Sequence, residues 1–122
     1  ARSTFRFEGS YVWVSAGEVQ KPERHLMVAR DAIETTVVTR EEELVHVEVR
    51  ARNPDRWLLL AIDCANPFYC VGFLAKIASS LSHAGIDLLA ISTFTRDWIF
   101  VKEAEGARAG EVLRGIGLQP PD

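Results

Sequence analysis

The segment DCANPFYCVGF, residues 63–73, holds the residue types best suited to chemistry in this 122-residue chain: two cysteines, a carboxylate, an amide and aromatic rings. Five residues separate Cys64 from Cys70, whereas zinc sites space paired cysteines by roughly two to four residues and need a second pair of ligands. The chain has no other cysteine. We therefore expect no metal and no cofactor, and a buried structural role for Cys70. A disulfide between the two cysteines stays open, although a cytosolic setting disfavours it.

Motifs of common catalytic sites are absent from the sequence. It contains no G-x-S-x-G elbow, neither glycine-rich nucleotide-binding motif, and no cysteine next to a histidine. A nucleophilic site would have to be assembled from distant residues. We therefore predict that the protein is not an enzyme, and we keep a small enzyme acting through Cys64 or Asp63 as the weaker alternative.

The same segment fits the junction between a strand and a helix better than a metal site or a catalytic site. The apolar run WLLLAID ends at Asp63, and Asn66 with Pro67 then provides an N-cap and a first helical residue. The free N–H groups at the start of a helix carry partial positive charge and suit a carboxylate. Gly72, one turn further on, either lets a ligand or a strand approach closely or only relieves packing.

A second polar position interrupts the apolar run LLAISTF, residues 88–94. The hydroxyls of Ser92 and Thr93 need hydrogen-bond partners if this run is a partly buried strand. Those partners are either groups of a neighbouring strand or turn, or a small polar ligand. The sequence leaves both readings open.

Composition limits the partners and the setting. The formal net charge is −3, from 14 basic and 17 acidic residues, and acids are interleaved with the arginines. Nucleic acid is therefore not an expected partner. The sequence has no apolar run of the roughly 18 to 20 residues that a membrane helix needs, and its first residues lack the apolar centre of a signal peptide. We expect a cytoplasmic protein with no membrane partner.

The first half of the chain favours strands. Alternating apolar residues in TFRF and YVWV, with EGS between them, predict a hairpin, and the polar stretch SAGEVQKPER predicts a loop with at most one helical turn. TTVVT predicts a strand because it is rich in β-branched residues. VHVEVRA predicts a half-exposed strand with Val45, Val47 and Val49 on one face.

The second half favours alternating strands and helices. WLLLAID predicts a central strand, and a helix from Asn66 to Gly85 follows, with an apolar stripe that includes Ile77 and Leu81. IDLLAISTF and WIFVKE predict an antiparallel pair, and a second helix begins near Glu105. The expected fold is α+β, with helices on one face of an antiparallel sheet.

These residues carry a family resemblance. TTVVTREEELVHVEV, WLLLAID and VGFLAKIASSLSHAGIDLLAISTFTRDWIFVKE together resemble ACT-domain proteins of the small tandem type, which are related to cytosolic arginine sensors and to the regulatory domains of aspartokinases. AGIDLLAISTFTRDWIFV is similar to the family's Gly-Ile, I-S-T-aromatic and Asp-aromatic-I-x-V pattern. VVTREEEL is similar to its V-T-R-x-x-x-E-L stretch.

The resemblance implies two ferredoxin-like (βαββαβ) ACT units, an incomplete one in residues 1–54 and a second in residues 55–122. It also implies a homodimer and an amino-acid ligand bound at a seam between units. The positions that match the family's ligand-binding residues are Asn66, Pro67, Phe68, Val71 and Gly72 in the loop and helix start, Ser92, Thr93 and Phe94 in the strand, and Asp97 in the turn.

The resemblance thus predicts a non-catalytic regulatory protein that binds an amino acid or a similar small metabolite and acts allosterically on a regulated enzyme. The alternative is a protein-interaction or dimerisation module. In that alternative the bulky Phe68 or Tyr69 would fill the ligand pocket.

Overall fold

A computed structural model of the chain describes residues 3–63, 70–94 and 96–120. Cys64, Asn66, Pro67, Phe68 and Tyr69 lie outside these residues, so what the sequence predicts for them stays a prediction. The side chains of Cys70 and Val71 are not described either. Among the described residues, no helix is long and apolar enough to cross a membrane.

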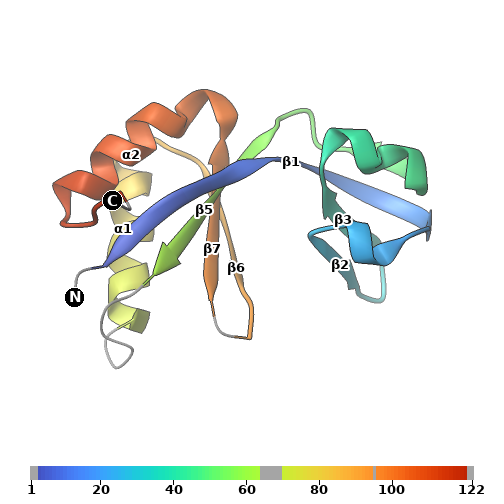
Figure 1. The fold of residues 1–122 in the computed structure, drawn as a ribbon, viewed down its shortest axis with the longest axis horizontal. Helices are drawn as coiled ribbons and strands as arrows, with labels where there is room; N and C mark the ends of the chain where they lie inside the picture. Colours follow the sequence, from blue (N-terminus) through green and yellow to red (C-terminus); the bar gives the residue numbers. More distant parts are fainter. Residues whose placement is uncertain (1–2, 64–69, 95, 121–122) are drawn as a thin grey trace. The chain divides into compact units, whose positions relative to one another are not determined.

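The described elements are strands, two α-helices and short 3₁₀ helices (Figure 1). In chain order they are β1 (Thr4–Val19), the 3₁₀ helix η1 (Pro22–Arg24), β2 (Met27–Arg30), β3 (Thr35–Thr39), the 3₁₀ helix η2 (Glu41–His46), β4 (Val47–Arg52), β5 (Trp57–Asp63), α1 (Cys70–His83), β6 (Leu88–Ser92), β7 (Asp97–Lys102), the 3₁₀ helix η4 (Glu103–Glu105) and α2 (Gly106–Gly115). The chain divides into two compact units, residues 1–9 with 58–122, and residues 10–57.

The first unit contains both α-helices and the strand order β1-β5-β7-β6. β6 and β7 pair antiparallel from Leu88↔Val101 to Ser92↔Asp97, as the sequence predicts. Both helices pack with the strands around one core. Its fully buried members come from β1, β5, α1, β7, α2 and the C-terminal segment: Phe5, Leu60, Ile77, Leu81, Val101, Ala109, Leu113 and Leu118. The α+β class is therefore confirmed, and an antiparallel pair lies at one side of this sheet.

Helix α1 ends where the sequence predicts. Gly85 has φ of +76°, a conformation that a residue without Cβ adopts without strain. The N–H of Ile86 donates to the carbonyl of Leu81 at 3.0 Å, and the N–H of Gly85 donates to Ser82 at 3.0 Å. These two bonds are those of a Schellman C-cap, which satisfies the last carbonyls of the helix and turns the chain toward β6.

The second unit, residues 10–57, is built from β2, β3, β4 and most of β1. β3 pairs antiparallel with β1 from Val12↔Thr39 to Ala16↔Thr35, and with β2 from Met27↔Val38 to Arg30↔Thr35. TTVVT is thus a strand, as predicted. All residues of this unit are described, and none is in an α-helix. Two ACT-like units in tandem remain a prediction.

Three predictions about the first half were wrong. TFRFEGSYVWV forms no hairpin: β1 is continuous from Thr4 to Val19, because Gly9 accommodates a φ of +98° within the strand and its two halves serve different units. SAGEV lies in the same strand instead of a loop. Val45 belongs to η2 and is 80% exposed, so it does not share a strand face with Val47 and Val49.

Candidate functional site

A small hollow lies between α1 and the turn end of the β6–β7 hairpin. Its volume is about 70 Å³. The lining residues come from one helix and two strands: Leu74 and Ala78 from α1, Ala90, Ile91 and Ser92 from β6, and Asp97, Trp98 and Ile99 from β7. All belong to the first unit.

Small side chains produce this hollow. Directly opposite residues of an antiparallel pair point to the same face of a sheet. Ala90 opposes Ile99, and Ser92 opposes Asp97. Ala90 and Ser92 are short, and so is Ala78 on the helix, so the sheet and the helix leave unfilled space at this end. Further along, Leu81 and Val101 are fully buried and close the core.

One polar pair stands at the rim of the hollow. The hydroxyl of Ser92 donates to Oδ1 of Asp97 at 2.8 Å. Ser92 is exposed and Asp97 is half-buried. A carboxylate can accept about four hydrogen bonds, so Asp97 keeps acceptor capacity beyond this one. The rim therefore suits a hydrogen-bond donor or a cation, while most of the lining suits an apolar group.

Thr93 and Phe94 were expected in the strand but lie in the turn beyond this pair, and Asp97, expected in the turn, is the first residue of β7. The hydroxyl of Thr93 donates to the carbonyl of Arg96 at 3.1 Å and accepts from its N–H at 3.0 Å, and the N–H of Thr93 donates to the same carbonyl at 2.8 Å. Thr93 therefore fixes the turn. Phe94 is fully exposed and does not line the hollow.

At the start of α1, only two of the predicted site residues are among the described residues. Val71 and Gly72 lie in the first turn of α1. Gly72 is exposed, and a Cβ placed on it would meet no described atom within 4 Å. The described residues therefore give no packing reason for glycine at this position. Of the nine predicted site residues, the structure brings Ser92 and Asp97 to the hollow, and a role in ligand binding stays a prediction for all of them.

Six of the lining residues were not predicted from the sequence. They are the apolar ones: Leu74, Ala78, Ala90, Ile91, Trp98 and Ile99. A signal was present, because a helical spacing of four joins Leu74 to Ala78 and a strand spacing of two joins Ala90 to Ser92. In the described residues, no three His, Cys, Asp or Glu side chains gather as metal ligands.

Comparison with known proteins places this unit in a family. The sequence profile of the ACT domain matches residues 52–115, which is 64 of the 122 residues. The chain belongs to the ACT-domain family. The matched region runs from the end of β4 to the end of α2 and contains every residue of the hollow. ACT domains indicate a regulatory role that involves binding a small molecule.

Two solved structures share the fold of this ACT protein. One is VC0802 from Vibrio cholerae, a protein of unknown function described as a possible transport protein, with a TM-score of 0.77 and 20% identity over 93% of this chain and 89% of its own. The other is Atu0741 from Agrobacterium tumefaciens, with a TM-score of 0.77 and 21% identity over 99% and 93%. Such identities show the fold alone. No curated protein matched the chain.

Proposed function

We propose that this ACT-domain protein binds a free amino acid or a similar small metabolite at the hollow between α1 and the β6–β7 hairpin, without catalysing a reaction. The observation that carries the proposal is the Ser92–Asp97 pair at the rim of an apolar hollow inside the ACT match. An amino acid offers an ammonium group to such a carboxylate and a side chain to such a hollow.

The size of the hollow limits what enters it. One water needs about 10 to 15 Å³ of such space, so 70 Å³ holds only a few heavy atoms. A short aliphatic side chain fits this space with its ammonium group at Asp97. The carboxylate of the ligand is then expected at the start of α1, where the sequence predicts free N–H groups behind Asn66 and Pro67.

Regulation in this proposal follows from different affinities in two arrangements of the protein. A ligand that binds one arrangement better shifts the population toward it, typically with a coupling of about 1 to 3 kcal/mol. β6 ends the strand order of the described residues, so its outer edge can accept a further strand. We propose that a homodimer forms in the cytoplasm and passes occupancy of the hollow to a regulated enzyme.

A thermal-shift screen of the full chain against the twenty amino acids tests this function. A ligand that binds only the folded state raises the melting temperature with its concentration. We expect a dose-dependent rise for at least one small amino acid, and a smaller rise when Asp97 is replaced by Asn. The control is Glu111→Gln, which removes an exposed carboxylate of α2. If none of the twenty raises the melting temperature at millimolar concentration, the proposal is wrong.

One observation favours a second function, a protein-interaction module. Phe94 is fully exposed at a turn that three hydrogen bonds between Thr93 and Arg96 hold in place. An exposed aromatic ring on such a turn is a suitable anchor for a protein partner. Under this alternative, Phe94→Ala abolishes self-association or partner binding and leaves the melting temperature unchanged. An unchanged sedimentation profile and unchanged partner binding in that variant would count against it.

A further inference from the structure

Residues 10–57 contain a separate hollow of about 240 Å³. Two arginines, two glutamates and a tyrosine line it: Arg24, Arg40, Glu42, Glu43 and Tyr11. The formal charges of the four ionic side chains balance. In two other hollows of the same unit, three of the charged side chains have hydrogen-bond partners: Arg52 with Glu41, Arg30 with Thr35, and Asp31 with two backbone N–H groups.

The cationic side of this hollow is a guanidinium held on an aromatic ring. The guanidinium carbon of Arg40 lies 4.9 Å from the centre of the Tyr11 ring, and Nη2 donates to the Tyr11 hydroxyl at 3.3 Å. Stacking of this kind orients the planar fork. No carboxylate of the described residues pairs with Arg40, and a guanidinium has five N–H donors. Two of its remaining N–H groups can therefore donate to the two oxygens of a carboxylate.

The anionic side is a carboxylate oxygen without a hydrogen bond. Oε1 of Glu43 is buried and has no hydrogen-bond partner among the described residues. Its neighbours are Nη1 of Arg24 at 3.6 Å and Nε2 of His46 at 3.8 Å. Both distances exceed the 2.7 to 3.2 Å range, roughly, of an N–H···O bond. Buried acceptors in folded proteins normally have a hydrogen-bond partner, so a ligand with a donor group would satisfy this oxygen.

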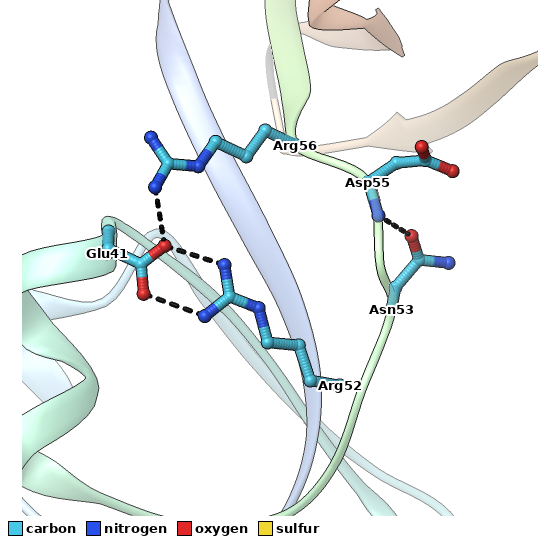
Figure 2. A network of polar contacts seen from close by, with 5 residues as sticks. All are labelled: Glu41, Arg52, Asn53, Asp55 and Arg56. Atoms are coloured by element: carbon cyan, nitrogen blue, oxygen red, sulfur yellow. Dashed lines mark hydrogen bonds and ion pairs between the residues drawn. The ribbon is translucent and has the colours of Figure 1, made fainter.

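Neighbouring contacts hold the segments that line the hollow. Glu41, the first residue of η2, accepts from both arms of Arg52 at 2.6 and 2.7 Å and from Arg56 at 2.9 Å (Figure 2). This network fixes the helix that carries Glu42 and Glu43 and begins next to Arg40. The ring of His25, which also lines the hollow, contacts the Thr39 hydroxyl at 2.8 Å and the Gln20 carbonyl at 2.9 Å. These contacts restrict the motion of the lining, which lowers the entropic cost of binding.

We propose that this hollow binds a small zwitterion, with its carboxylate on Arg40 and its ammonium group on Glu43. A simple anion would satisfy Arg40 and leave the Glu43 oxygen without a donor, and a simple cation would do the reverse. A ligand that carries both charges satisfies both groups. The site is distinct from the hollow beside Asp97, because the two have no residue in common.

Amide NMR titrations of the full chain test this proposal. The probes are glycine, β-alanine and 4-aminobutyrate, which separate the two charges by increasing lengths, with acetate and methylammonium as single-charge controls. We expect saturable shifts at the amides of Arg24, His25, Arg40 and Glu43 with at least one zwitterion. The single-charge controls should bind at least about tenfold more weakly, because each lacks one charge-assisted contact.

Variants then assign the two contacts. Arg40→Gln and Glu43→Gln should each weaken the responding zwitterion about tenfold, and Arg40→Lys should weaken it less because the charge is kept. Asp97→Asn, in the other hollow, should leave this affinity unchanged. Unchanged amide positions outside the hollow verify that each variant is folded.

Three results would overturn the proposal. The first is the absence of a saturable shift at these amides with all three zwitterions. The second is binding of acetate or methylammonium as tight as that of the zwitterion. The third is full affinity in both Arg40→Gln and Glu43→Gln. None of these bears on the function proposed for the Asp97 hollow, whose amides are read separately in the same spectra.

Discussion

Ser92 donates a hydrogen bond of 2.8 Å to Asp97 across the last residue pair of the β6–β7 ladder. The bond fixes a carboxylate at the rim of an apolar hollow whose other wall is α1. A ligand at this position would touch the helix and the hairpin at once. Binding would then stabilise one arrangement of the two elements, which is what a regulatory domain requires.

The first prediction concerns the carboxylate. Asp97→Asn keeps the shape of the side chain but removes its charge, so the affinity for the amino-acid ligand should fall about tenfold or more, the effect of losing one charge-assisted hydrogen bond. Isothermal titration calorimetry of the ligand found in the screen measures this. Ser92→Ala is the matched variant: it keeps the carboxylate and should weaken binding less. Equal losses of affinity in both variants would show that the Ser92–Asp97 hydrogen bond in the hairpin is needed for binding, and not the charge of Asp97 itself.

The second prediction concerns Gly72. Because the position is helical, exposed and free of described neighbours, Gly72→Ala should stabilise the protein by about 0.5 to 1 kcal/mol. Urea unfolding measures this change. Ligand titration of the same variant separates the two roles considered for this glycine. Weaker binding in a stabilised variant would show close approach of the ligand, and unchanged binding would show that the ligand does not need glycine at this position.

Much of the core unit could be predicted from the sequence because its patterns are local. The apolar stripe of α1 and the glycine that ends it depend on neighbours along the chain, and Ile77, Leu81 and Gly85 all lie as predicted. The β6–β7 pair follows from two apolar runs joined by a short turn.

The first half was harder because its structure depends on distant partners. EGS has the composition of a turn, yet Gly9 lies within a long strand whose ends pair with β5 and with β3, segments that the local pattern cannot reveal. Similarly, the alternation of apolar residues predicts Val45 in a strand, but Val45 lies in η2. The start of η2 is held by hydrogen bonds from Arg52 to Glu41, eleven residues apart in the chain. The apolar lining of the hollow could not be predicted for a related reason. The hollow is formed by the packing of α1 against β6 and β7, and the sequence pattern of each element alone does not show how they pack.

The third prediction concerns the core. Leu81 is fully buried in the core shared by α1 and the sheet. Leu81→Ala should lower the free energy of unfolding by about 2 to 5 kcal/mol, because it removes buried methyl groups and leaves a cavity. Urea unfolding followed by circular dichroism measures the loss. Leu89→Ala, at a half-buried position of β6, is the matched control and should cost less; equal losses would contradict the packing described here.

The fourth prediction concerns acid stability. The hydrogen bonds from Arg52 are the largest cause that lowers the pKa of Glu41 below its usual 4.5. The unfolded state therefore takes up the proton first, so this contribution to stability is fully present above pH 4.5 and is lost as the pH falls through the folded pKa. Asp31 behaves in the same way below its usual 3.8, because the backbone N–H groups of Glu34 and Ile33 lower its pKa.

Glu41→Gln removes the proton-linked part of this contribution. Its unfolding midpoint in urea should fall less steeply than that of the parent protein as the pH is lowered from 4.5. Glu111→Gln, which removes an exposed carboxylate of α2, is the control and should change the slope less. The same slope in Glu41→Gln as in the parent would contradict the role given to the Arg52–Glu41 pair.

Binding of an amino acid beside Asp97 is tested most directly by mapping where the amino acid binds. The full chain is titrated with each of the twenty amino acids while its amide NMR spectrum is recorded. We predict saturable shifts at the amides of Leu74, Ala78, Ser92 and Asp97 with at least one amino acid, and their loss in Asp97→Asn. The absence of any saturable shift at these amides, or shifts of equal size and affinity in Asp97→Asn, would contradict it.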